Sequence, residues 1–70
     1  MKTIGTAIRN LRLKNRLSQT ELAHLINVPS QSKISAWECG NSIPDILEAL
    51  RLAEVFKLSL EELIDISVDA

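Results

Sequence analysis

The side chains best suited to specific hydrogen bonding lie in one short segment, from Gln31 to Cys39. If this segment is a helix with its apolar residues facing inward, it presents outward Gln31, Ser32, Ser35 and Ala36. A glutamine can pair with adenine through two hydrogen bonds, serines can donate to or accept from several base edges, and an alanine methyl can touch that of thymine. A solvated helix face has the same composition, so the neighbouring elements must decide between these two interpretations.

A second short helix is expected directly before this segment. Ser18 and Glu21 have the spacing of a capping box, which predicts a helix from about Gln19 to Ile26 with an inward face of Leu22, Ala23 and Ile26. Two short helices joined by about four residues are the minimum for reading the major groove, which is roughly 12 Å wide. The amino end of the first helix of such a pair can bind a phosphate through its free amides.

The turn between these two helices has its own signals. Asn27 tolerates the left-handed conformation in which helices commonly end, and Pro29 discourages helix at Val28. Ser30 can then cap the next helix, which Ile34 and Trp37 hold against the domain.

Three further helices complete an all-α architecture. Ile4, Ile8 and Leu11 mark a first helix from about Ile4 to Asn15 by their spacing. Asp45 with Glu48, and Ser59 with Glu62, repeat the capping signal for a fourth and a fifth helix. The apolar positions of the last two helices are Ile46, Ala49, Leu50, Leu52, Ala53 and Phe56, followed by Leu60, Leu63 and Ile64.

The charges divide the 70-residue chain into two unlike parts. We define the basic half as residues 1–40, where six Lys and Arg face two Glu for a balance of +4, and the acidic half as residues 41–70, where two basic residues face seven acidic ones for −5. Such an asymmetry is a hint of nucleic-acid contact on the basic half, although scattered surface charge would also produce it. The longest uncharged run, residues 22–32, is too short for a membrane span, and the single Cys39 suits a reducing cytoplasm.

From Ile4 to about Ile64 the sequence resembles the helix-turn-helix domain of the phage repressor and Cro family. The matching segments are IGTAIRNLRLKNRLSQTELA (4–23), ISAWECG (34–40) and IPDILEALRLAEVFKLSLEELI (43–64). The resemblance implies a compact five-helix, lambda-repressor-like DNA-binding domain over residues 1–66, with 67–70 as a short C-terminal tail. It also implies a repressor of transcription that binds double-stranded operator DNA, usually as a homodimer on two half-sites.

The resemblance assigns roles to individual residues. Gln19 matches a phosphate-binding glutamine, and the base-reading positions fall on Gln31, Ser32 and Ala36, with Ser35 beside them. Asn41 and Ser42 match a segment that contacts the DNA backbone, while Arg12 and Glu38 match a partly buried ion pair between the first and third helices. We also expect phosphate contacts from Arg16, Ser18 and Lys33.

One departure from the family spacing affects the base contacts. Between Ala23 and Ile34 this chain has one residue more than is usual. The additional residue either lies in the turn, which keeps Ser30 as the cap, or lengthens the third helix at its amino end. The choice sets the register of Gln31 and Ser32 against the bases.

The sequence is also compatible with other functions. The same fold could serve as a protein-interaction or antitoxin-like module without operator binding, and a patch around Leu47, Val55 and the last helix could be a self-association surface. No phosphate-binding glycine loop, metal-ligand spacing or nucleophile-base set is present, so we expect no enzyme, no cofactor, no metal and no small-molecule ligand. His24 has no second strong metal ligand within sequence range.

Overall fold

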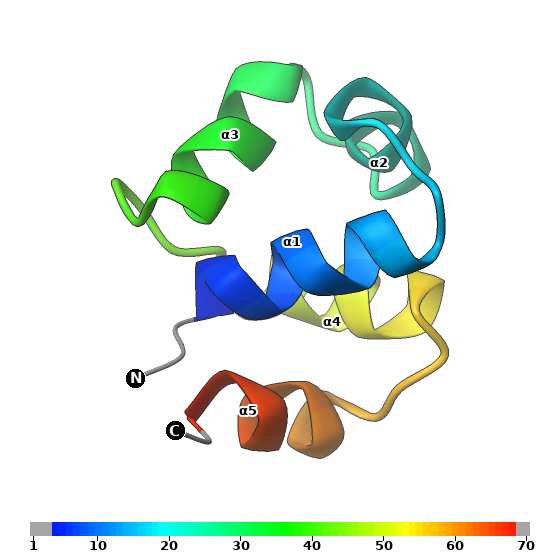
Figure 1. The fold of residues 1–70 in the computed structure, drawn as a ribbon, viewed down its shortest axis with the longest axis vertical. Helices are drawn as coiled ribbons and strands as arrows, with labels where there is room; N and C mark the ends of the chain where they lie inside the picture. Colours follow the sequence, from blue (N-terminus) through cyan, green and yellow to red (C-terminus); the bar gives the residue numbers. More distant parts are fainter. Residues whose placement is uncertain (1–3, 69–70) are drawn as a thin grey trace.

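The computed structural model describes residues 4–68, which form five helices and no strand. The helices are α1 (Ile4–Lys14), α2 (Gln19–Leu25), α3 (Gln31–Cys39), α4 (Ile46–Val55) and α5 (Leu60–Val68). Helix α1 runs through the middle, with α2 and α3 on one side and α5 on the other (Figure 1). The all-α, five-helix class expected from the sequence is confirmed. Helix α5 includes residues 67 and 68 of the expected tail, and residues 69 and 70 lie outside the described part.

Capping boxes start three of the helices through purely local hydrogen bonds. The amide of Glu21 donates to Ser18 Oγ at 2.9 Å and the amide of Ser18 donates to Glu21 Oε1 at 2.8 Å. These two bonds lower the pKa of the Glu21 carboxyl below its ordinary value. The same reciprocal pairs start α4, from Asp45 and Glu48, and precede α5, from Ser59 and Glu62.

Helix α3 starts differently from the expectation. Ser30 has the extended backbone of an N-cap residue, with φ −153° and ψ 152°, but its side chain makes no capping hydrogen bond. Its role at this terminus is therefore limited to the backbone conformation.

Helices α1, α2 and α4 end in the same C-terminal motif. Arg16, Asn27 and Lys57 have φ of 57°, 60° and 59°, in the left-handed region. The residue after each donates its amide to the carbonyl five positions earlier, as in a Schellman motif, and packs its side chain against the core: Leu17, Val28 and Leu58. The sequence predicted this conformation for Asn27 only.

The additional residue of the turn lies between α2 and α3. Helix α2 ends at Leu25 and α3 begins at Gln31, with Ser30 still four residues before the buried Ile34. The other possibility, a third helix lengthened at its amino end, is therefore not what the structure has. Gln31 occupies the first helical position of α3.

The core is aliphatic apart from Trp37 and Phe56. The inward face predicted for α2, and both Ile34 and Trp37 of α3, are buried. In α4 the buried apolar residues are Ala49, Leu52 and Ala53, and the C-cap residue Phe56 that follows the helix is buried too. Ile46, Leu50 and, on α5, Ile64 are exposed although the sequence placed them among the apolar positions, because the faces in contact with the core are narrower than the apolar pattern.

Glycine allows α1 to approach α3 closely. Gly5 is buried, and a Cβ built on it would lie 1.9 Å from the carbonyl oxygen and 3.0 Å from the carbonyl carbon of Trp37. Both atoms are backbone, so a side chain at residue 5 could be accepted only if one helix moved. None of the described helices is long and apolar enough to cross a membrane.

Candidate nucleic-acid interface

A bidentate ion pair fixes α3 against α1. Arg12 Nε donates to Glu38 Oε2 at 2.7 Å, and Nη2 donates to Glu38 Oε1 at 3.1 Å. The third donor, Nη1, bonds the carbonyl oxygen of Leu17 at 2.9 Å. Only 11% of the Arg12 side chain and 5% of that of Glu38 are exposed, and the hydrogen bonds to Glu38 raise the pKa of Arg12. These are the two residues for which the resemblance implied a partly buried pair.

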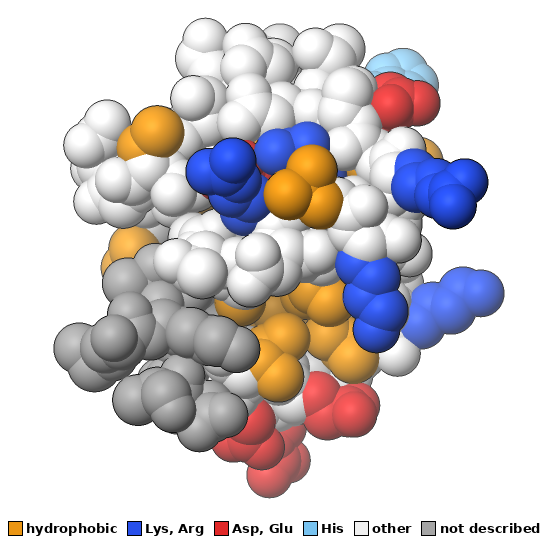
Figure 2. Space-filling model, in the orientation of Figure 1, with side chains coloured by type: hydrophobic (Ala, Val, Ile, Leu, Met, Phe, Trp, Pro, Cys, Tyr) orange, Lys and Arg blue, Asp and Glu red, His pale blue; other side chains and the backbone are white. Residues whose placement is uncertain are grey.

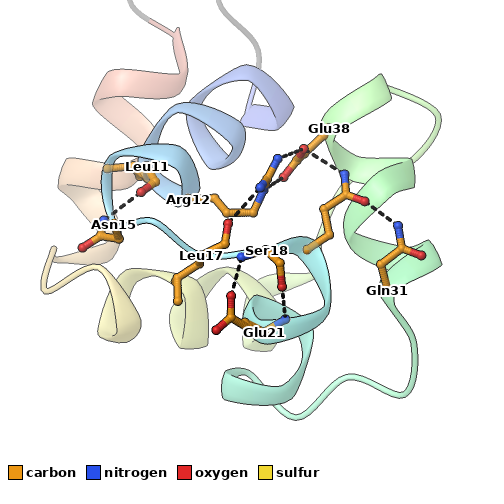
Figure 3. Close-up of polar contacts among 9 residues, drawn as sticks. Leu11, Arg12, Asn15, Leu17, Ser18, Glu21, Gln31 and Glu38 are labelled. Carbon is orange, nitrogen blue, oxygen red and sulfur yellow. Dashed lines mark hydrogen bonds and ion pairs between the residues drawn. The ribbon is translucent and has the colours of Figure 1, made fainter.

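The ion pair continues outward through two glutamines (Figure 3). Gln19 Nε2 donates to Glu38 Oε1 at 3.0 Å, and Gln31 Nε2 donates to Gln19 Oε1. A carboxylate only accepts hydrogen bonds, so the amide nitrogen of Gln19 must face Glu38 and its oxygen must face Gln31. We call the series Arg12, Glu38, Gln19, Gln31 the glutamine relay. It joins the first residues of α2 and α3 to a buried charge pair on α1 and α3.

The relay also decides what Gln31 presents to its surroundings. One N–H of its amide is used by Gln19, which leaves its carbonyl oxygen and its second N–H. Adenine offers an acceptor, N7, beside a donor, N6–H, on its major-groove edge. The remaining groups of Gln31 match that pair.

The other predicted contact residues surround these helix starts. Ser32 is exposed, while Ser35 and Ala36 are half-buried. Ser18 and Arg16 are exposed beside the start of α2, although the Ser18 hydroxyl is used in the capping box. The exposed Asn41 and Ser42 follow α3, and both amides donate to the carbonyl oxygen of Ala36, at 2.9 and 3.4 Å.

Lys33 is placed differently from these residues. Its ammonium group forms an ion pair with Glu48 Oε2 at the start of α4. Over the whole residue, Glu48 has the lowest exposure of any charged residue in the described part of the chain, with 8% of its surface exposed. The sequence predicted Glu48 as part of a capping box but not its contact with Lys33, because the spacing of two residues on different helices does not predict that they meet.

The charges of the two halves are also separated in space. Figure 2 shows Lys and Arg side chains across the middle of one face, near α1, and acidic side chains mainly at the α5 end, with a smaller acidic area beside the histidine at the α2 end. Mostly uncharged side chains cover the α2 and α3 end in this view. The basic band thus lies next to the pair of helices that carries the glutamine relay.

The order of these helices matches a known family. The family model described as helix-turn-helix matches residues 8–63, which is most of the chain and includes the capping box, the relay and both glutamines. Among curated protein sequences, none matches this chain.

Solved structures of bacterial and phage regulators have the same fold. The P22 c2 repressor in complex with a synthetic operator is 28% identical, with a TM-score of 0.82 over 90% of this chain and 94% of that chain. The restriction-modification controller protein C.AhdI from Aeromonas hydrophila is 30% identical, with a TM-score of 0.77 over 86% and 89%. SinR, a master regulator for biofilm formation, in complex with DNA is 28% identical, with a TM-score of 0.80 over 90% and 100%.

Proposed function

The chain belongs to the Cro/C1-type helix-turn-helix family of DNA-binding transcription regulators, and we propose that it is a sequence-specific repressor that inserts α3 into the major groove. The observation that carries this proposal is the glutamine relay, which joins the amino ends of α2 and α3 to one buried ion pair. In this pose α2 crosses the DNA backbone while the first residues of α3 meet the base edges. The site of action is the cytoplasm.

The contacts divide into those that position the protein and those that specify sequence. For phosphates we propose Arg16, Ser18, Gln19, Asn41 and Ser42, all of which lie near the ends of the two helices. For bases we propose Gln31, Ser32, Ser35 and Ala36. Lys33 is not included in the phosphate set because Glu48 already binds its ammonium group.

Among the base contacts, Gln31 should contribute the largest discrimination. Replacement of Gln31 with alanine is expected to weaken operator binding by roughly 1 to 3 kcal/mol, since a bidentate contact to adenine is lost. The operator is first obtained by selecting bound duplexes from a random pool, and affinities are then measured by fluorescence anisotropy. The preference for A·T at one base pair of each half-site should disappear in the variant.

Asn10, an exposed amide on α1, provides the matched control. Asn10→Ala should leave the operator affinity and the base preference unchanged. A Gln31→Ala protein that keeps the wild-type preference at every position would show that Gln31 does not specify a base.

The salt dependence of the wild-type protein separates DNA binding from the alternative of a protein-interaction module. Phosphate contacts release counterions, so the logarithm of the affinity should fall by about 0.9 per contact for each tenfold increase in salt. Selection that enriches no sequence, together with no salt-dependent binding to a random duplex, would favour the interaction module instead.

A two-fold operator calls for two copies of the domain, and α4 offers an apolar surface for a second copy. We define the α4 surface as Ile43, Ile46, Leu47 and Leu50, which are 76%, 80%, 55% and 43% exposed. The last three share one side of α4 by their spacing, and Ile43 lies three residues before Ile46. Of the patch expected from the sequence, Leu47 belongs to this surface, whereas Val55 packs against the core.

Polar substitution of the α4 surface is expected to produce a monomer. The variant Ile46→Ser/Leu50→Ser should lower the mass measured by sedimentation equilibrium to that of one chain and weaken binding to a full operator at least tenfold. Binding to a single half-site should be retained. Leu13→Ser removes a leucine of comparable exposure from α1 and should leave the mass unchanged; a dimer that persists in the α4 variant would place the contact elsewhere.

A further inference from the structure

The hydrogen bonds of the capping box hold Glu48 in place independently of Lys33. Its Oε1 accepts the amide of Asp45 at 2.9 Å, and its own amide donates to Asp45 Oδ1 at 2.8 Å. The glutamate is buried, with its side chain 10% exposed, whereas the side chain of Lys33 is 42% exposed. The carboxylate is therefore the fixed partner of the ion pair, and the long lysine side chain bends toward it.

Breaking this pair would leave a buried charge. The second oxygen of Glu48, Oε2, is the atom that binds the Lys33 ammonium group. A buried carboxylate without a counter-charge is costly. A DNA phosphate that binds the Lys33 ammonium group must therefore also offset the free energy lost when the Glu48 carboxylate is left unpaired. A phosphate contact by an unpaired lysine has no such cost.

This competition has a consequence for sequence discrimination. Contacts to phosphates bind all DNA sequences alike, and they supply most of the affinity for random DNA. Lys33 lies on α3 directly after Gln31 and Ser32, where an unpaired ammonium group would be close to the duplex in the proposed pose. We propose that Glu48 is a positioning residue that withholds Lys33 from the DNA backbone and so lowers affinity for non-operator DNA. This inference rests on the proposed DNA binding.

The test compares the salt dependence of binding to a random duplex for wild type, Glu48→Gln, Lys33→Met and the double variant. In Glu48→Gln the glutamine oxygen can still accept the Asp45 amide, so the capping box is kept while the charge is lost. The freed Lys33 should steepen the slope of log affinity against log salt by about 0.9. Between 50 and 200 mM salt, this makes the loss of affinity about threefold larger than in wild type.

The remaining variants separate a freed lysine from a general change of charge. Glu54→Gln removes an exposed carboxylate from the same helix and should leave the slope at the wild-type value. The double variant Lys33→Met/Glu48→Gln should return to the wild-type slope, because the freed ammonium group is absent. Circular dichroism and the thermal midpoint verify that each protein is folded.

Two failures are distinguishable. If Lys33→Met alone flattens the slope by about 0.9, Lys33 already binds a phosphate in the wild-type protein. If Glu48→Gln leaves the slope unchanged, the freed Lys33 binds no phosphate. In either case the role proposed for Glu48 is wrong, while DNA binding stands. If the folded wild-type protein shows no salt-dependent binding to any duplex, the proposed function fails and this inference fails with it.

Discussion

Replacement of Gly5 with alanine is expected to lower the free energy of unfolding by about 3 kcal/mol, at the upper end of the usual cost of overpacking. The added Cβ would lie 1.9 Å from the carbonyl oxygen of Trp37, a backbone atom that cannot rotate away. Helix propensity alone predicts the opposite result, a gain of about 1 kcal/mol for alanine within a helix. The steric term should win because α1 or α3 must move as a whole.

Gly40 provides the matched control for this substitution. Its φ is 81°, and a Cβ built there meets no atom within 4 Å, so Gly40→Ala tests backbone strain without a clash. Its cost should be about 1 kcal/mol. Urea denaturation measures both variants, and a Gly5→Ala protein as stable as wild type would show that α1 and α3 lie further apart than in this structure.

Removal of Arg12 is expected to be comparably destructive. Arg12→Met leaves the Glu38 carboxylate buried without its partner, which should cost about 3 kcal/mol of stability. For a domain of this size such a loss lowers the thermal midpoint by roughly 12 to 24 °C. Arg9→Met, which removes an exposed arginine from the same helix, should change the midpoint little.

A double variant separates the stability of the ion pair from its role at the DNA. In Arg12→Met/Glu38→Leu no charge is left buried, so most of the lost stability should return. The carboxylate that binds Gln19 is absent, however, so the glutamine relay is broken and operator affinity should stay low. Full recovery of both stability and affinity would show that the relay does not position Gln31.

The parts of the fold that could be predicted from the sequence are those that depend on neighbours in the chain. Capping boxes are local, so Ser18 with Glu21 and Asp45 with Glu48 located two helix starts correctly. The left-handed conformation of Asn27 could be predicted from its residue type. Arg16 and Lys57 adopt the same conformation without such a signal, because there the following leucine, drawn into the core, requires it.

The parts that could not be predicted depend on contacts between helices. Gly5 has a role only because Trp37 lies against it, and the sequence contains no sign of that distance. Lys33 was predicted as a phosphate ligand, and its ion pair with Glu48 on α4 could not be foreseen from the sequence. The position of the additional residue was open in the sequence, and the start of α3 at Gln31 places it in the turn. The roles assigned to individual DNA contacts stay predictions.

The separation of a basic half from an acidic half gives this nearly neutral molecule an electric dipole. Near a duplex, such a dipole experiences a torque that turns the acidic end outward before any contact forms. We therefore expect fewer encounters in a wrong orientation, and faster association than for an evenly charged domain of the same net charge. Salt would therefore act on the rate of arrival as well as on the lifetime of the complex, even though the chain as a whole carries a charge of only −1.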